Sequence, residues 1–401
     1  MAAVADLAGD GRFFTSEFTM TLRKTLWLLP LAVAACSDND NAAPPPFKDL
    51  AVVAARAPDY SSGAVSLIDQ QPPYAATNNL APTTSDIVVR SGGDHYFLIE
   101  RFGSDRIKRF DPENPQTPAY TYSTQDAGDT QSSNPYDLIS AAADKAYLLR
   151  YGSGSLWIVD PSATDEASFK IGEIDLSALD DDGIPEMSAA ILRGSRLYVA
   201  LQRLENFAAT RSGQLAVIDV ATDTLVDTID LPVRSPSRLL ADPEGERLFV
   251  VADGGFDGSF APLYEGGIAV VDTAESEATL LIDDGTPEDA PYGQIADAVV
   301  VDAQRGYFIG SAGFGDDQTL YRFDPDAPAT PVVVAGLAGV GLSSLAVDVQ
   351  GQVWVGRSES AAPGVTVLGF AAGAETVLAP LVDTVLTPIN IDFVTVAEVA
   401  R

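Results

Sequence analysis

The sequence predicts an all-β fold: a seven-bladed β-propeller of four-stranded antiparallel blades, closed by the C-terminal strand joining the first blade. The 401 residues are rich in Val, Ile, Thr and Tyr and include 33 Gly and 26 Pro, a composition typical of β-proteins. An apolar run that ends in Asp and then turns recurs at intervals of roughly 40 to 60 residues, the period of a propeller or a solenoid. A strand that the first repeat lacks is present at the end of the chain.

The N-terminal segment has the pattern of a sorting signal. Residues 20–36 read "MTLRKTLWLLPLAVAAC": a basic start, an apolar stretch too short to span a bilayer, and small residues. Because "LAVAAC" resembles a bacterial lipobox, we expect residues 20–35 to be a lipoprotein signal peptide and Cys36 to be lipidated. The alternative is a buried thiol behind an ordinary cleavage site. Residues 1–19 are then an upstream extension, and Ser37, by resemblance to bacterial sorting rules, implies the outer membrane, on its periplasmic or cell-surface face.

The segment 36–48 is polar and then Pro-rich, so it cannot pack and is expected to be a flexible tether. The propeller is predicted to span 49–401. Cys36 is the one cysteine of the chain, so a mature domain without disulfides must be held by its core alone.

Each repeat contains an apolar strand that ends in Asp. The copies are "AVSLID" at Asp69, "DRIKRFDP" at Asp111, "SLWIVDP" at Asp160, "QLAVIDV" at Asp219, "GIAVVDT" at Asp272 and "TLYRFDP" at Asp324, with a degenerate "GVTVLGF" near Gly369. An upstream hairpin such as "RLLADPEGERLFVVAD" precedes most copies, and its tight polar turn is typical of two antiparallel strands. Two strands of the hairpin, the strand that ends in Asp and the strand after the turn make one four-stranded blade.

The recurring Asp has a structural role. The chain must reverse directly after the third strand, and an aspartate can accept hydrogen bonds from backbone N–H groups two or three residues further on. Each Asp belongs to its own blade, so we do not interpret the series as a metal site.

The first unit begins with "LAVVAAR", a second strand, and lacks an innermost one. The segment "TPINIDFVTV" at 387–396 supplies it, so the C-terminal strand is expected beside residues 51–55, which removes open sheet edges. Seven units then give seven blades; six or eight remain open if the degenerate copy is misread.

The stretch "RLYVALQ…GQLAVIDVATDTLVDTIDLP…SPSRLLADPEGERLFVVAD" resembles the YVTN-type repeats (surface-layer, 40-residue repeats) of bacterial and archaeal seven-bladed propellers, here in a bacterial lipoprotein. The units at Asp219 and Asp272 match closely, and those at Asp69, Asp111 and Asp324 loosely. The resemblance implies the fold over nearly the whole mature chain. It implies little about activity, because propellers carry enzymes, scaffolds and binding proteins alike.

Long loops are predicted to gather on one face. Segments 125–137, 202–213, 252–267 and 283–297 join second to third strands or one blade to the next, and such connections share a face, which is where function is concentrated in a rigid scaffold. They and neighbouring loops carry aromatic and Arg residues of the kind enriched in binding surfaces. The predicted ligand-binding residues are Tyr60, Arg101, Phe102, Tyr136, Tyr151, Arg203, Phe207, Phe256, Phe260, Tyr264, Tyr292 and Phe314. Several could instead pack beneath their own loops.

Composition excludes some chemistry. The net charge of −33 excludes non-specific nucleic-acid binding, since phosphate is repelled. The one histidine, His95, lies in a hairpin, so no Ser/His/Asp or Cys/His catalytic set and no imidazole-based metal site is expected. No catalytic residue is assigned. Ca²⁺ could be held through oxygen ligands of 175–186 or 313–318, although solvated acidic loops are the simpler interpretation.

Three functions compete. The first is a lipid-anchored, extracytoplasmic binding protein that captures a small ligand or docks on an outer-membrane receptor or transporter through its long-loop rim. It resembles the anchored propellers that assist TonB-dependent transport. The second is a lactonase-like or quinone-dependent propeller enzyme with a divalent ion in the central channel, which inward-facing carboxylates from several blades would favour. The third is an outer-membrane assembly scaffold, which a flat apolar rim would favour. The long loops and the missing nucleophiles favour the first.

Overall fold

The computed structural model describes residues 47–243, 247–259, 261–311, 318–328 and 330–397. The predictions for residues 1–46, including lipidation of Cys36, lie outside this part of the chain. In the described residues no helix is long and apolar enough to cross a membrane.

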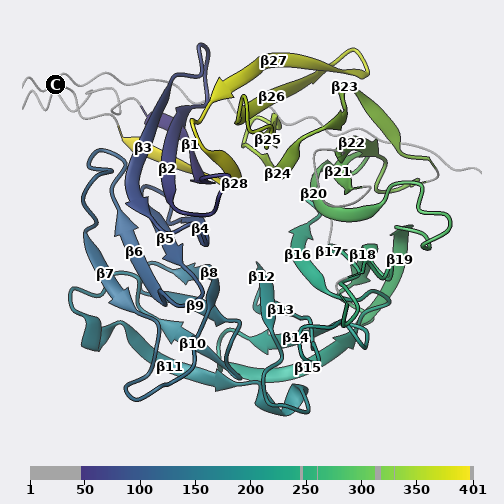
Figure 1. Cartoon of the computed structure of the whole chain (residues 1–401). Helices are drawn as coiled ribbons and strands as arrows, with labels where there is room; N and C mark the ends of the chain where they lie inside the picture. The colour runs from purple at the N-terminus through teal and green to yellow at the C-terminus, as the bar shows by residue number, and fades with distance from the viewer. Residues whose placement is uncertain (1–46, 244–246, 260, 312–317, 329, 398–401) are drawn as a thin grey trace, which may run out of the picture. The chain divides into compact units, whose positions relative to one another are not determined.

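Seven sheets of four antiparallel strands stand around a central axis like the blades of a propeller (Figure 1). This confirms the predicted fold and the number of blades. Two short 3₁₀ helices, η1 (Glu166–Ser168) and η2 (Ser177–Leu179), lie in connections of the third blade.

From the axis outward, blade 1 consists of β28 (Thr387–Ala397), β1 (Phe47–Arg56), β2 (Gly63–Asp69) and β3 (Ala76–Thr83). Blade 2 consists of β4 (Ile87–Ser91), β5 (Tyr96–Glu100), β6 (Arg106–Phe110) and β7 (Tyr120–Ser123), and blade 3 of β8 (Pro135–Ala142), β9 (Lys145–Arg150), β10 (Ser155–Val159) and β11 (Lys170–Asp175). Blade 4 consists of β12 (Met187–Arg193), β13 (Arg196–Leu201), β14 (Gln214–Asp219) and β15 (Thr224–Asp230). In the same order, blade 5 consists of β16 (Pro236–Ala241), β17 (Leu248–Ala252), β18 (Gly267–Asp272) and β19 (Glu277–Asp283). Blade 6 consists of β20 (Gln294–Asp302), β21 (Arg305–Ser311), β22 (Gln318–Phe323) and β23 (Val332–Val340). Blade 7 consists of β24 (Leu342–Val347), β25 (Val353–Arg357), β26 (Gly364–Ala371) and β27 (Ala374–Asp383).

The ring is closed by the C-terminal strand, as predicted. β28 pairs antiparallel with β1, with Phe393 opposite Ala51 and Asn390 opposite Ala54. The first blade is thus built from both ends of the propeller, so unravelling either terminal strand opens the ring.

The hydrophobic core lies between the blades. Each of seven clusters of buried side chains combines strands of two neighbouring blades, for example Tyr198 and Val217 of blade 4 with Val250 and Val271 of blade 5. The second strand of most blades is buried along its length, as in β5 and β17, because both of its faces are covered. Burial of apolar area on both sides, at about 25 cal/mol per Å², is what holds such a sheet stack together.

Five of the six recurring aspartates accept backbone bonds in their turns, as expected, whereas Asp69 is paired with Lys48. Asp219 Oδ1 accepts backbone N–H bonds from Ala221 and Thr222, both at 3.0 Å. Asp272 and Asp324 accept the same pair of bonds from the residues two and three positions ahead. Their role is structural.

The antiparallel order of the strands gives the ring two unlike faces. We call "loop face" the one that carries the connections between second and third strands and between blades, and "turn face" the one that carries the hairpin turns and the aspartate turns. The long loops singled out in the sequence lie on the loop face, so the search for a site starts there.

Candidate functional site

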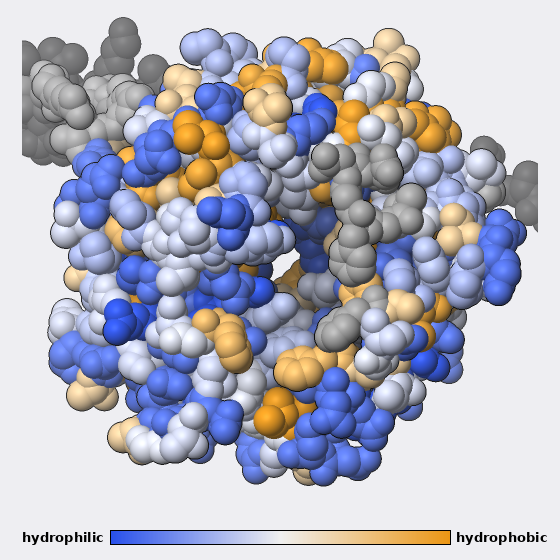
Figure 2. All heavy atoms as spheres, in the orientation of Figure 1, coloured by the Kyte–Doolittle hydropathy of each residue, from blue (hydrophilic) through white to orange (hydrophobic). Residues whose placement is uncertain are grey.

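A cavity of about 610 Å³ occupies the central channel. Its lining comes from all seven innermost strands and from Arg101 on the loop face. In the space-filling view the middle of the ring is open, with hydrophilic residues around the opening (Figure 2). A concave site with polar groups at the axis of a rigid ring is the usual place for a ligand.

Polar side chains inside the channel cross-link neighbouring innermost strands. Asn390 Oδ1 accepts a bond from Val89 N–H at 2.8 Å, and Asp392 Oδ2 one from Ser91 N–H at 2.9 Å. On the other side Asp297 Oδ2 accepts a bond from Leu345 N–H at 2.7 Å. An innermost strand has no further strand to pair with, so these side chains satisfy N–H groups that would otherwise be exposed at a sheet edge.

Two arginines lie in the same channel. Arg90 bonds Asp137 of the next blade, and Arg238 Nη1 lies 2.5 Å from Asp297 Oδ1 and 2.9 Å from Leu345 O. Burial raises the pKa of Asp392, and Arg90 opposes this shift. The channel wall therefore alternates acidic and basic groups instead of presenting one sign of charge, and its groups are largely engaged with one another.

At the loop-face end of the channel three of the predicted residues come together. The Arg101 guanidinium lies 4.0 Å from the centre of the Tyr136 ring, and Tyr136 stacks on Tyr151 with ring centres 4.5 Å apart. Tyr151 Oη donates to Gln202 Oε1 at 2.6 Å, and Gln202 Nε2 donates to Pro236 O at 3.1 Å. This chain of contacts crosses from blade 2 to blade 5 and makes a rigid aromatic and polar rim; we call it the mouth stack (Arg101, Tyr136, Tyr151, Gln202).

The backbone is unusual where it enters the channel. The residue directly before the innermost strand has positive φ in four consecutive blades: Asn134 (45°), Glu186 (47°), Ser235 (53°) and Gly293 (68°). Positive φ costs energy for residues other than Gly, and such residues gather at functional sites. Here they form an arc along four of the seven blades at the mouth, and Asn134 Oδ1 is buried with no hydrogen-bond partner in the described part of the chain.

Two carboxyl groups of this region have raised pKa values. Burial raises the pKa of Glu186 to about 7, and Asp182 and Asp180 add to the shift, although Leu204 N–H bonds the carboxylate at 2.9 Å. Burial also raises the pKa of Asp253, opposed by bonds from Ser235 and Gly255. The mouth therefore holds a carboxyl that changes protonation near neutral pH, a feature typical of functional sites.

The long loops of blades 4 and 5 hold one another in place. Ala209 N–H donates to Phe256 O at 3.2 Å, and Arg234 N–H donates to Glu265 O at 2.8 Å. Arg211 bonds Asp180 at 2.5 Å. A rim fixed in this way would lose little conformational freedom on contact with a ligand.

The other predicted residues lie outside the mouth stack. Tyr60, Phe102 and Phe207 are exposed at separate loop tips, by 61%, 71% and 81%. The guanidinium of Arg56 lies 4.3 Å from the centre of the Tyr60 ring. Tyr292 packs edge-on against Phe308 and Tyr321 as part of a core cluster.

Arg203 and Tyr264 are half-buried residues with positive φ in the loops of blades 4 and 5. Phe256 forms an isolated bridge with Pro262. Phe260 and Phe314 lie outside the described residues.

Sequence reasoning missed the polar residues of the channel and of its entrance. For those in strands the signal was one or two charged or amide residues inside an otherwise apolar strand, as in "DIVVRS", "QIADAV" and "PINIDF", whereas Glu186, Gln202 and Asp253 lie in connections and carried no such signal. The missed residues are Arg90, Asp137, Glu186, Gln202, Arg238, Asp253, Asp297, Asn390 and Asp392.

The two segments considered for Ca²⁺ show no such site in the described residues. In 175–186, Asp175 and Asp182 accept bonds from backbone N–H groups two residues ahead, and Asp180 is paired with Arg211. Most of 313–318 lies outside the described part. Within that part no group of three or more His, Cys, Asp or Glu side chains is arranged to hold a metal ion.

Comparison with known proteins identifies the fold. No protein-family model and no curated protein matches the sequence. Among solved structures, a Lactobacillus plantarum protein has a TM-score of 0.60 at 15% identity, covering 86% of this chain and 99% of that one. Proteins named "putative 6-phosphogluconolactonase" from Bacteroides uniformis and Bacteroides fragilis have TM-scores of 0.60 and 0.58 at 14% and 11% identity, covering 86% of this chain and 99% and 98% of theirs. At this identity the likeness shows a propeller fold and not an activity.

Proposed function

We propose that this protein is a binding propeller that captures a small ligand at the loop-face mouth of its central channel. The observation that carries the proposal is the mouth stack, in which Arg101 and Tyr136 line the 610 Å³ cavity and Tyr151 supports them. A rigid pair of rings and a guanidinium plane offer stacking area at little entropic cost. The ligand that fits has a planar or aromatic part to stack there and polar atoms for the channel.

We further propose that the chain acts in the cell envelope, as an outer-membrane lipoprotein anchored through Cys36. The support is the lipobox-like "LAVAAC" and Ser37 after it. The YVTN-type repeat belongs to the same proposal. An outer-membrane receptor or transporter that docks on the loop face would then receive the ligand, and the exposed tips of Tyr60, Phe102 and Phe207 are available for that contact.

The test of ligand capture compares two cation–π pairs on the same face. Tyr136→Ala removes a ring that lines the cavity, whereas Tyr60→Ala removes a ring under Arg56 that does not. Native mass spectrometry of protein purified from its own host identifies a co-purifying small molecule, and calorimetry measures its affinity. We expect Tyr136→Ala to weaken binding about fivefold, since a stacked ring contributes about 1 kcal/mol, and Tyr60→Ala to leave it unchanged. Equal loss in both variants, or none in Tyr136→Ala, contradicts the proposal.

The anchor has its own test. Incorporation of a palmitate analogue into the wild-type chain and its absence from Cys36→Ser support lipidation. Equal labelling of both chains refutes the anchor but leaves the binding site untouched.

A second candidate is lactone hydrolysis, which one observation favours. Glu186 lies at the mouth with a pKa of about 7, the value that suits a general base acting on water near neutral pH. Hydrolysis of gluconolactone or its 6-phosphate by the wild type and its loss in Glu186→Gln would support this candidate and replace simple capture. The absence of turnover with retained binding supports the first proposal.

A further inference from the structure

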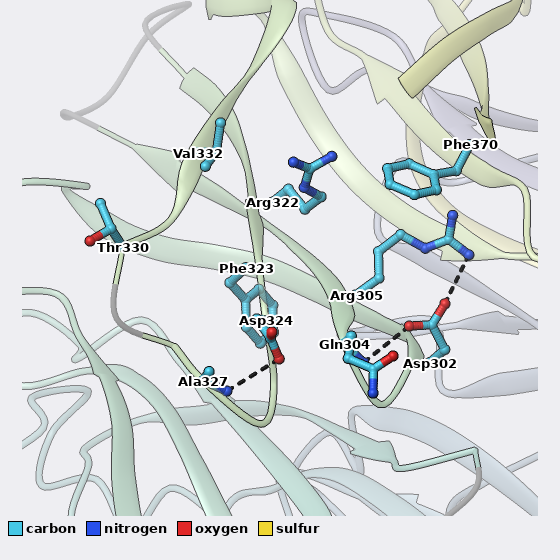
Figure 3. Close-up of a pocket in the computed structure, with 10 residues that line it drawn as sticks. All are labelled: Asp302, Gln304, Arg305, Arg322, Phe323, Asp324, Ala327, Thr330, Val332 and Phe370. Atoms are coloured by element: carbon cyan, nitrogen blue, oxygen red, sulfur yellow. Dashed lines mark hydrogen bonds and ion pairs between the residues drawn. The ribbon is translucent and has the colours of Figure 1, made fainter. Parts of the chain in front are cut away.

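A second cavity lies on the turn face, far in the chain from the mouth residues. It has a volume of about 560 Å³ and is lined by β21, β22 and β23 of blade 6, their turns, and Phe370 of blade 7. Figure 3 shows the side chains of Arg305, Arg322 and Phe370 gathered at one end of it, with Val332 beside Arg322 on the neighbouring strand and Thr330 farther away.

Two guanidinium groups meet one aromatic ring in this pocket. The Cζ atoms of Arg305 and Arg322 lie 4.4 and 5.3 Å from the centre of the Phe370 ring. Each arginine has one acidic partner: Arg305 lies 3.0 Å from Asp302, and Arg322 lies 2.8 Å from Glu375. A guanidinium has five N–H donors, so both groups retain donors, and Arg305 Nε is buried with no partner in the part of the chain that the structure describes.

The two carboxylates that line the pocket are engaged in turns and in an ion pair. Asp302 Oδ1 accepts from Gln304 N–H at 3.1 Å and Oδ2 from Arg305. Asp324 Oδ1 accepts from Asp326 and Ala327 N–H at 2.9 and 3.2 Å. These contacts do not use up the N–H donors of Arg305 and Arg322, so a ligand that bonds the two guanidinium groups must bring acceptor oxygens.

Residues 332–385, which include Val332 and Phe370 of the pocket lining, form a flank of blades 6 and 7 with few charged residues. More than half of the large exposed apolar side chains of the described structure lie there. They are Val332, Val333, Val349, Phe370, Val377, Leu378, Leu381 and Val385.

The charged residues of this flank are few and mostly satisfied. Asp348 is buried and bonded to Trp354, Arg357 is paired with Glu359, and Glu375 is paired with Arg322. In a chain of net charge −33, this is a surface that an anion with an apolar body can approach without the general repulsion.

We propose that the turn-face pocket binds an anionic amphiphile. Its carboxylate or phosphate head accepts hydrogen bonds from Arg305 and Arg322, and its apolar chain lies against Phe370 and Val332. Forked donors to an anion give orientation, and the apolar chain supplies most of the affinity because the formal charges around the head nearly cancel.

The test titrates soluble probes into the full chain by calorimetry: decanoate, decyl phosphate and inorganic phosphate, all below micelle-forming concentrations. We expect one decanoate or decyl phosphate per chain and at least about tenfold weaker binding of inorganic phosphate, which lacks the apolar chain. Flotation with phosphatidylcholine vesicles, with and without phosphatidic acid, tells a free amphiphile from a membrane lipid as the source: association that requires phosphatidic acid assigns the lipid. If neither the soluble amphiphiles nor the vesicles that contain phosphatidic acid bind to the protein, the proposal is overturned.

Matched variants locate the site. Arg305→Gln and Arg322→Gln should each weaken decyl phosphate binding about tenfold through loss of a charge-assisted bond. Arg196→Gln is the control, because Arg196 begins β13 as Arg305 begins β21 and is likewise paired with an Asp, outside the pocket. Val332→Asp, at a position 53% exposed, blocks the pocket with little risk to folding, and Val226→Asp on β15 is its control. Binding that survives all three pocket variants, or that falls equally in the controls, refutes the assignment.

Discussion

Asp284 is a carboxyl group whose burial opposes folding at neutral pH. It is 0% exposed in the connection after β19, and its two oxygens both lie 3.2 Å from Gly266 N. Burial raises its pKa from the ordinary 3.8 to about 7, and the charges of Asp283 and Asp253 add to the shift. No basic partner contributes to that shift, so the ionised form is poorly compensated.

The pH dependence follows from where the proton is held. The native protein binds the Asp284 proton more tightly than the unfolded chain, so it binds more protons between pH values of about 4 and 7, and stability falls as the pH rises through this window. A rise of roughly three units in the pKa of Asp284 corresponds to a free energy of unfolding that is about 4 kcal/mol lower above pH 7, at 1.36 kcal/mol per unit. Below the pKa that Asp284 has in the unfolded chain, the carboxyl is protonated in both states and does not change the free energy of unfolding.

Asp284→Asn removes the ionisation and keeps the shape and one acceptor for Gly266 N–H. We expect the variant to be more stable than the wild type by about 2 to 3 kcal/mol at pH 8, since the amide gives back about 1 kcal/mol of charge-assisted bonding. The two proteins should become equally stable near pH 4.

The assay is urea unfolding followed by circular dichroism at several pH values between 4 and 8.5, with Asp144→Asn as the control, because Asp144 is an exposed carboxylate that does not contribute to the pKa shift of Asp284. The difference in unfolding free energy between Asp284→Asn and the wild type should grow with pH and level off above about 7. A variant that is less stable at pH 8, or a difference that does not depend on pH, refutes the reasoning.

Three further changes test the fold. Ending the chain after Leu386 removes β28 and leaves the first blade open, so we expect cooperative unfolding to be lost and the protein to aggregate. Calorimetry measures the loss of cooperativity, and size-exclusion chromatography measures the aggregation. A chain ending after Ala397 is the control and should behave as the wild type. Asp272→Ala removes the acceptor for Ala274 and Glu275 N–H and should cost about 1 kcal/mol in urea unfolding; no cost would contradict the structural role of the repeat. Trp354→Phe leaves buried Asp348 without the 2.9 Å bond from Nε1 and should cost about 1 to 3 kcal/mol, with unchanged stability counting against that bond.

The fold was predictable because short sequence patterns that repeat along the chain determine it. The run that ends in Asp, the tight turns and the missing first strand each follow from backbone chemistry over a few residues. The pairing of Asn390 with Ala54 could be predicted over a long sequence distance because ring closure leaves one unpaired place for one unpaired strand. The number of blades followed from the same count.

The site was predictable only in part. Arg101, Tyr136 and Tyr151 were chosen as aromatic and Arg residues in loops, and the structure brings them together because each lies at the same height, next to the end of a second strand or the start of a first one. The same rule also chose Tyr292, which is in a core cluster. Residue type and loop position do not decide whether a ring faces the channel or the neighbouring blade, since that depends on packing between blades.

The channel residues escaped prediction for a different reason. Asp297 and Asn390 serve N–H groups of the neighbouring blade, so their partners are about 50 residues away or at the opposite end of the chain. A lone polar residue in an apolar strand signals that something pairs with it but not what. Once the ring is known, a polar residue in an innermost strand can be interpreted first as a cross-link to the neighbouring blade. The polar groups at the ends of the channel that do not form such cross-links, Glu186 and Asn134 among them, are the better candidates for ligand contact.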